Sequence, residues 1–165
     1  MIYSSSGKYA IRACIHLAQL PQGHNALAKD VAQVEGVPAP FMAKILQQLA
    51  RKGLLNSRTG PTGGFSLRMA ASDITLMALL DAADGLSERM CFINGPDSWM
   101  EQDEWAAHPG WLELQARILG FLGQTTIADL VEAAAQRKSA MERPLSYKVA
   151  AQAAGGSTEP EGWGS

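Results

Sequence analysis

Apolar residues return every three or four positions along the N-terminal third of the chain, which is the period of an α-helix. The pattern predicts three helices, over residues 4–20, 26–34 and 38–52. Pro21-Gln22-Gly23 and Glu35-Gly36 are typical of helix ends and separate the three. The side chains expected to face a common core are Tyr9, Ala10, Ala13, Cys14, Leu17, Leu20, Leu27, Val31, Phe41, Met42, Ile45, Leu46 and Leu49.

The helical pattern then gives way to two short strand candidates, residues 54–57 and 64–67. Turn-forming residues fill the space between them, so we predict a β-hairpin. A fourth helix is expected over residues 74–83, capped by Ser72-Asp73. The residues at the tip of the hairpin are Arg58, Thr59, Gly60, Pro61, Thr62 and Gly63.

The second half of the chain is less regular. Residues 86–110 are polar and mixed, and we expect a long loop there. A fifth helix is predicted over residues 111–123, and Thr126 with Asp129 resembles a capping box that opens a sixth helix, through Ala135. The sequence after Tyr147 has almost no large apolar side chain, so we predict a disordered tail.

These patterns divide the chain into a module of residues 1–72, a region of helices and loop over residues 73–136, and a tail over residues 137–165. The net charge is −2, but its distribution is uneven. The first module has eight Lys and Arg against two Asp and Glu, a net charge of +6, and the remainder has a net charge of −8. This asymmetry indicates a basic half that meets a polyanion, although chance segregation of solvated charges is the alternative.

Three helices followed by a hairpin are typical of a winged helix-turn-helix. The predicted fold class is therefore mostly α with a small β-hairpin wing. In such modules the third helix enters the major groove of DNA. Hydrogen bonds to bases could come from Lys44, Gln47 and Gln48, whereas Met42 and also Phe41 can be core residues. The predicted DNA contacts of the helical part are Lys8, Ala39, Pro40, Phe41, Lys44 and Gln47.

The hairpin tip gives the stronger indication of DNA binding. Its glycines allow the backbone to lie close to another surface, and Arg58 suits a narrow minor groove. An ordinary hairpin turn is the alternative. We predict DNA contacts at Arg58, Thr59, Gly60, Pro61, Thr62 and Gly63.

Several motifs together resemble the Rrf-two family of bacterial transcription regulators. They are Gly7-Lys8-Tyr9-Ala10-Ile11-Arg12, Phe41-Met42-Ala43-Lys44-Ile45-Leu46-Gln47-Gln48-Leu49, Lys52-Gly53-Leu54-Leu55-Asn56-Ser57, Gly60-Pro61-Thr62-Gly63-Gly64-Phe65-Ser66-Leu67, Asp73-Ile74-Thr75-Leu76 and Thr125-Thr126-Ile127-Ala128-Asp129-Leu130. The resemblance spans about residues 1–135. It implies a repressor that binds a palindromic operator as a homodimer.

The family resemblance implies that the fifth helix is a long C-terminal dimerisation helix, and the amphipathic stripe there supports this assignment independently. The predicted dimerisation residues are Trp111, Leu114, Ile118, Phe121 and Leu122. The chain also departs from the family. Thr59 occupies the place of an Arg before the wing Gly-Pro, with Arg58 one position earlier, and Ala43 replaces a frequent polar or acidic residue. The operator sequence therefore cannot be transferred from relatives.

Sensing members of the family hold an iron–sulfur cluster through three closely spaced cysteines after the fourth helix. Only Cys91 stands in that region here, so no cofactor is predicted. A cluster would need a mixed site of Cys91, His108 and an acid such as Asp97 or Asp103. A lone redox-sensitive thiol at Cys91 is a further alternative, and a small-molecule or protein effector is left open.

Other classes of function receive less support. The chain has no nucleophile elbow, phosphate-binding glycine loop or zinc-protease motif, so we do not expect an enzyme. A winged-helix adaptor that binds a protein instead of DNA is the alternative function. There is no apolar run of about 18 residues and no leader pattern, and two cysteines fit a reducing compartment. We therefore expect a cytoplasmic protein.

Overall fold

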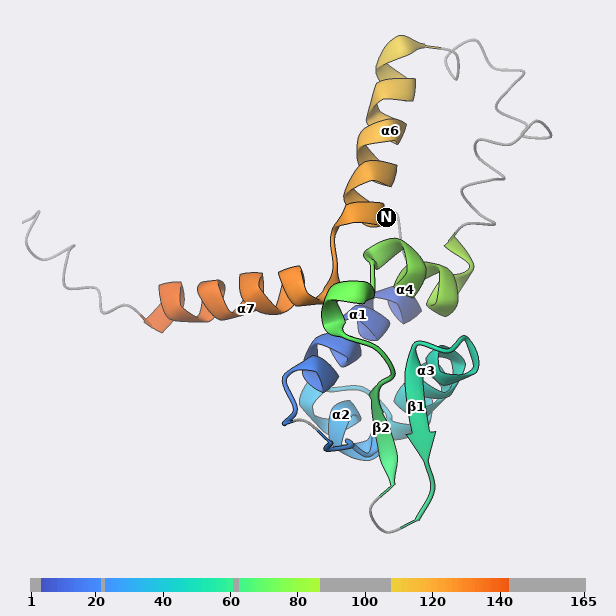
Figure 1. Cartoon of the computed structure of the whole chain (residues 1–165), viewed down its shortest axis with the longest axis vertical. Coiled ribbons are helices and arrows are strands. Elements are labelled where there is room, and N and C mark those ends of the chain that lie inside the picture. The colour runs from blue at the N-terminus through green and yellow to red at the C-terminus, as the bar shows by residue number, and fades with distance from the viewer. Residues whose placement is uncertain (1–3, 22, 61–62, 87–107, 143–165) are drawn as a thin grey trace, which may run out of the picture. The chain divides into compact units, whose positions relative to one another are not determined.

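The computed structural model of the chain describes residues 4–21, 23–60, 63–86 and 108–142. It divides into two compact units, residues 1–133 and 134–165. The first unit holds a winged-helix module, the next two described helices and the start of the last one (Figure 1). The segment after Tyr147, predicted to be disordered, and most of the predicted loop lie outside the described residues. Of the tail predicted over residues 137–165, residues 137–142 are helical.

Three helices form the N-terminal module: α1 (Ser5–Ala18), α2 (Ala28–Glu35) and α3 (Ala39–Arg51). Their ends follow the local chemistry. The Ser4 hydroxyl accepts hydrogen bonds from the first-turn amides of α1, and Gly36 ends α2 with a φ of 66°, where a side chain would be strained. The predicted apolar faces meet in one core, whose fully buried members include Ala10, Ala13, Cys14, Val31, Met42, Leu46 and Leu49.

The start of α2 differs from the prediction. Ala26 lies before the helix and exchanges two backbone hydrogen bonds with Phe65 of the hairpin, at 2.9 and 2.8 Å. Leu27 is the residue that caps α2, and 36% of its surface is exposed. The expectation that Leu27 faces the core is therefore wrong, because strand pairing at Ala26 turns the next side chain outward. Val31 and Ala32 supply the buried face of α2.

The predicted hairpin is present as β1 (Leu55–Arg58) and β2 (Gly64–Leu67), which pair antiparallel. Gly64 has a φ of 128°, and a Cβ at this position would lie 2.5 Å from the carbonyl oxygen of Ala26. The backbone pairing between Ala26 and the hairpin therefore depends on glycine at position 64. This pairing anchors the hairpin to the helical module.

α4 (Leu76–Asp84) begins two residues later than expected. Its cap is Thr75, whose hydroxyl accepts a hydrogen bond from the Ala78 amide at 3.2 Å, whereas Ser72-Asp73 belongs to a short 3-10 turn. At the other end of α4, Asp84 accepts hydrogen bonds from the Ser4 amide and hydroxyl at 3.1 and 2.6 Å. The C-terminal end of α4 is thereby tied to the start of α1.

The last two described helices are α6 (Pro109–Gln124) and α7 (Ile127–Glu142), so α7 continues past Ala135. The predicted capping box is confirmed, since the Thr126 amide donates to Asp129 at 2.8 Å and the Asp129 amide donates to the Thr126 hydroxyl at 3.3 Å. The amide of Leu76 donates to Thr125 and that of Ile127 to Ile74, which joins the turn between α6 and α7 to the beginning of α4.

The architecture is thus mostly helical with a two-stranded wing, as predicted (Figure 1). α4 and the end of α6 share a second small core, formed by Leu76, Leu80, Leu86 and Leu122. In the part of the chain that the structure describes, no helix has the length and apolar character that crossing a membrane requires.

Candidate nucleic-acid interface

α3 has two distinct faces, as its 3.6-residue period requires. Its buried side chains are Met42, Ile45, Leu46 and Leu49. The residues exposed on the opposite side are Ala39, Pro40, Lys44, Gln47 and Arg51. The core therefore holds α3 by one face and presents the other to solvent, as a helix that enters a DNA groove must do.

Two of the residues grouped with this outer face have other contacts. Phe41 is half-buried and meets the ring of Tyr9 edge to face, with ring centroids 5.8 Å apart. The side-chain amide of Gln48 donates hydrogen bonds to the carbonyl oxygens of Ala82 and Ala83, both at 3.0 Å. Gln48 therefore connects α3 to the end of α4 and is not free to read a base, unlike its exposed neighbour Gln47.

Lys8 extends the basic surface from α3 to the first turns of α1. Its side chain is exposed, and its ammonium lies 5.6 Å from the centre of the Tyr9 ring. Because Tyr9 contacts Phe41 at the start of α3, the cation is held near the N-terminal end of that helix.

The wing has an exposed edge and a tightly folded turn. Arg58, Thr59 and Gly60 are exposed, while Pro61 and Thr62 lie outside the described residues. Gly63 is buried, and its amide donates to the Gly60 carbonyl at 2.9 Å. A Cβ on Gly63 would lie 2.5 Å from the carbonyl oxygen of Arg58, so this glycine is required by the turn itself.

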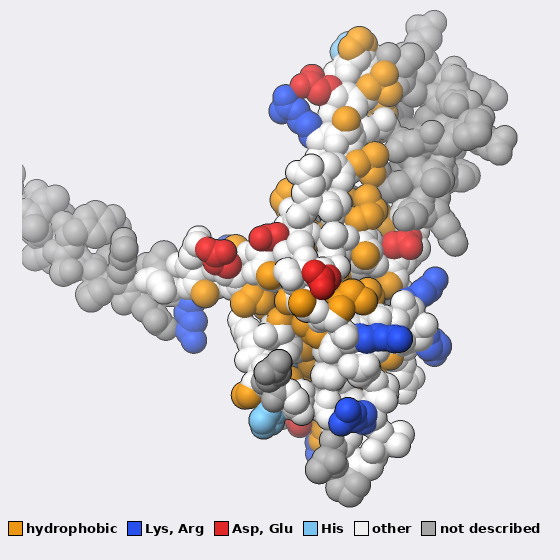
Figure 2. Space-filling view, viewed as in Figure 1, with side chains coloured by type: hydrophobic (Ala, Val, Ile, Leu, Met, Phe, Trp, Pro, Cys, Tyr) orange, Lys and Arg blue, Asp and Glu red, His pale blue; other side chains and the backbone are white. Residues whose placement is uncertain are grey.

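The charged residues of α3 and the wing are all Lys or Arg. Between positions 36 and 72 the sequence has no Asp or Glu, and its cations there are Lys44, Arg51, Lys52, Arg58 and Arg68. All five are exposed, and Figure 2 shows Lys and Arg side chains on the winged-helix module. The buried carboxylate of Glu35, which precedes this stretch, is paired with Arg12. The surface of α3 and the wing therefore attracts a polyanion, although the whole chain is slightly acidic.

The structure also places three residues that the sequence prediction left out, Ala50, Arg51 and Ser57, beside the predicted Gln47. Gln47, Ala50 and Arg51 of α3 and Ser57 of β1 line a shallow hollow of about 350 Å³. The helical spacing from Gln47 to Arg51 would have indicated that Arg51 shares the outer face. Ser57 could not have been found in this way, because its position depends on how the hairpin packs beside α3.

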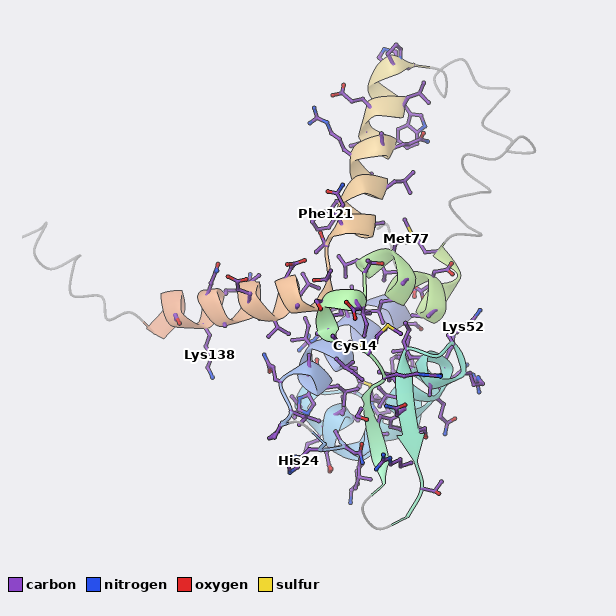
Figure 3. All side chains as sticks on the ribbon, viewed as in Figure 1. Cys14, His24, Lys52, Met77, Phe121 and Lys138 are labelled. Atoms are coloured by element: carbon purple, nitrogen blue, oxygen red, sulfur yellow. The ribbon has the colours of Figure 1, made fainter. Side chains whose placement is uncertain are left out.

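Most of the residues considered for a mixed cluster site lie outside the described residues. Cys91 lies outside them, and His108 is an exposed cap of α6 whose Nδ1 accepts a hydrogen bond from the Gly110 amide at 3.1 Å. Cys14 is fully buried, and its burial raises the pKa of the thiol to about 12, so it stays protonated (Figure 3). Among the described residues, no three His, Cys, Asp or Glu side chains gather as metal ligands.

α6 presents an apolar surface that the described chain leaves largely open. Of the predicted dimerisation residues, Leu114 and Phe121 are 48% and 59% exposed, and Trp111 and Ile118 are half-buried. Leu122 is buried in the small core against α4, so its contacts lie within one chain. Exposed Leu112 and Leu119 belong to the same helix and were not in the prediction. Figure 2 shows hydrophobic side chains along this helix.

Comparison with known proteins gives consistent matches. The model of the Rrf2 family, described as an iron-dependent transcriptional regulator, matches residues 3–133. An HTH-type transcriptional regulator of Aquifex aeolicus is 33% identical over 134 residues, which are 79% of this chain and 92% of that protein. The HTH-type transcriptional regulator IscR of Serratia proteamaculans is 30% identical over 132 residues, 79% of either chain.

Solved structures share the same fold. CymR, the global cysteine regulator of B. subtilis, superposes with a TM-score of 0.66 at 24% identity, over 79% of this chain and 95% of that one. IscR of T. potens superposes with a TM-score of 0.59 at 21% identity, over 79% of this chain and 86% of that one. These likenesses confirm the winged-helix architecture that the sequence predicts.

Proposed function

Because the chain belongs to the Rrf2 (Rrf-two) family of DNA-binding transcription regulators, which are not enzymes, we propose that it represses transcription as a homodimer on a palindromic operator. The reading surface in this proposal is the outer face of α3 together with the wing. Within a cell it acts in the cytoplasm, where the DNA and the reducing conditions suited to its two cysteines are found.

The observation that carries the proposal is the acid-free cationic surface on the two elements that reach DNA in winged-helix modules. Lys44 and Gln47 are exposed on α3, and Arg58 is exposed at the base of the wing tip. We assign base contacts to Lys44 and Gln47 and a minor-groove contact to Arg58. Ala39 and Pro40 lie against the floor or wall of the major groove, where their small apolar surfaces suit thymine methyl groups.

The remaining predicted residues have supporting roles in this proposal. Lys8 contacts a backbone phosphate, since its exposed ammonium lies beside the Tyr9 ring that contacts Phe41. Thr59 and Gly60 form the exposed wing edge that faces the groove, and Gly63 keeps the turn closed behind them. We also assign contacts with the groove to Pro61 and Thr62.

Homodimer formation is proposed from the open apolar face of α6. Leu112, Leu114, Leu119 and Phe121 are each more than one-third exposed on one helix. A run of large apolar side chains of this kind marks an interaction surface in a monomer. Two copies joined through α6 place two reading surfaces in one complex, which matches the two-fold symmetry of a palindrome. Around the helix, Trp111 and Ile118 lie between the pair Leu114 and Phe121 and the pair Leu112 and Leu119.

The test begins with selection of bound duplexes from a genomic fragment library, followed by affinity measurement with the winning duplex. Lys44→Ala and Arg58→Ala should each weaken binding by about tenfold or more, which corresponds to about 1.4 kcal/mol or more per contact. Lys138→Ala removes the same charge from α7 and serves as the control, with affinity expected to stay within about twofold.

A result in which all three variants bind the selected duplex as tightly as the wild type would remove α3 and the wing from the interface. Loss of repression is tested separately, by reporter expression from a promoter that contains the selected duplex. Higher reporter output in cells with Arg58→Ala than with wild type supports a repressor, and lower output indicates an activator.

A further inference from the structure

We propose that the hollow between α3 and β1 is a binding subsite for one phosphodiester group of the DNA strand that separates the major and minor grooves. The hollow is lined by Gln47, Ala50, Arg51 and Ser57. This inference rests on the proposed function and assigns a specific ligand group to Arg51 and Ser57, to which the sequence assigned no role.

The lining has the chemistry of a phosphate site. Arg51 supplies a guanidinium, which can donate two parallel hydrogen bonds to phosphate oxygens. Ser57 supplies a hydroxyl, a group that commonly donates to phosphate oxygens. Gln47, which the proposed function assigns to a base, and Ala50 complete the lining of the hollow.

The position of the hollow fits the path of a DNA strand. Gln47 and Arg51 are one helical turn apart on the exposed face of α3, whereas Ser57 belongs to β1, next to Arg58. When α3 lies in the major groove and the wing lies in the neighbouring minor groove, the sugar–phosphate strand between the two grooves passes over the surface that joins them. That surface is the one where these residues meet.

The charge around the hollow favours an anion and disfavours a cation. Among the described residues, no carboxylate is paired with Arg51, and the sequence from 36 to 72 has no acidic residue. Lys44 stands one turn before the hollow on α3, and Arg58 follows Ser57. The hollow is shallow and its polar lining is exposed, so it suits one group on a continuous polymer better than an enclosed small molecule.

The test combines protein variants with single neutral phosphates in the DNA. Methylphosphonate is placed at one backbone position at a time in the selected duplex, and affinity is measured for wild type and for Arg51→Ala. We expect one position in each half-site at which the methylphosphonate weakens wild-type binding by about tenfold but changes Arg51→Ala binding by less than about twofold. Ser57→Ala should lower the penalty at the same position to an intermediate value.

Lys52→Ala is the matched control, because Lys52 follows Arg51 directly and is exposed but does not line the hollow (Figure 3). Lys52 belongs to the same cationic surface, so Lys52→Ala is expected to lower the overall affinity, but the methylphosphonate penalty at the position assigned to Arg51 should equal that of the wild type. Arg51→Lys keeps the charge without the paired donors, so it should retain part of the penalty at that position. Thermal unfolding of each variant identifies any loss that comes from misfolding, and Arg51→Lys gives an answer where Arg51→Ala does not fold.

Two negative results have different meanings. If the wild type binds the duplex and Arg51→Ala shows the same penalty as the wild type at every position, the subsite is wrong and the proposed function stands. If the wild type binds no duplex from the library, the proposed function fails and the subsite fails with it.

Discussion

The winged-helix module and α6 differ in how much of their apolar surface is buried. In the module, the apolar face of each helix is covered by the others, and Leu46, Leu49 and Cys14 are inaccessible to solvent. In α6, only Leu122 is buried, while Phe121 beside it is 59% exposed (Figure 3). The core of the first region is complete within a single chain, whereas the second has an apolar surface that the described residues of the chain leave uncovered.

We infer from this difference that the core of the module determines the stability of the fold, whereas the exposed face of α6 determines self-association. The module that meets DNA is held by its own core, by the pairing of Ala26 with Phe65 and by the hydrogen bonds from Gln48 to α4. We therefore expect it to present the same surface in the monomer and in the dimer. α6 contributes little to the core of its own chain, so substitutions on its open face should change association more than folding.

The largest expected effect is the loss of core packing in Leu46→Ala. Leu46 is fully buried, so the truncation should lower the free energy of unfolding by about 2–5 kcal/mol. Leu114→Ala removes the same atoms from a side chain that is 48% exposed on α6 and should cost much less at dilute, monomeric concentrations. Urea unfolding of both variants checks this. Equal losses would contradict the proposed difference between the two regions.

The next effect concerns association. Phe121→Ala should raise the dissociation constant of the dimer by about tenfold or more, because about 1.5–3 kcal/mol accompanies burial of an aromatic side chain. Arg117→Ala, on the same helix and paired with Glu113, should change it by less than about threefold. Sedimentation equilibrium measures the dissociation constant of each variant. Unchanged self-association of Phe121→Ala would place the dimer contact elsewhere.

Replacement of either of two adjacent glutamines should have a smaller effect, and the two replacements should affect different properties. Gln48→Ala leaves the carbonyl groups of Ala82 and Ala83 without their side-chain donor and should cost about 1–2 kcal/mol of stability. Gln47→Ala changes an exposed residue, so its stability should stay within about 0.5 kcal/mol while its affinity for DNA falls. Unfolding and DNA-binding measurements on both variants check that one substitution lowers stability and the other lowers affinity. Equal stability of both variants would contradict the role given to Gln48.

The smallest effect is a pH dependence at the capping box of α7. Hydrogen bonds from Thr126 hold the pKa of Asp129 below its ordinary value of 3.8. A carboxylate with a lowered pKa stabilises the fold above 3.8 and loses that contribution as the pH falls through the lower folded value. The stability difference between wild type and Asp129→Asn should therefore be constant near neutral pH and shrink below about pH 4. Urea unfolding across this pH range measures the difference, and one that grows on acidification would contradict the assignment.

Local patterns predicted much of the fold because helices, caps and turns depend on neighbouring residues. The Thr126–Asp129 capping box, the end of α2 at Gly36 and the hairpin followed directly from the sequence. The exposure of Leu27 did not, because it results from strand pairing between Ala26 and Phe65, which are far apart in the chain.

The same limit of prediction from local sequence patterns applies to the candidate site. Helical period alone places Lys44 and Gln47 on the outer face of α3 and would also place Arg51 there. It cannot show that the amide of Gln48 is already engaged by α4 or that Ser57 lies beside Arg51. Those facts depend on tertiary packing, which a periodic pattern does not specify.

The most direct test of the account is the salt dependence of duplex binding by the full chain. If the cationic surface of α3 and the wing neutralises backbone phosphates, the logarithm of the association constant should fall linearly with the logarithm of salt concentration. The slope should be about −0.9 for each phosphate neutralised, and Arg51→Ala should reduce its magnitude by about one for each copy in the complex. An association constant that stays unchanged between low and moderate salt would contradict the account.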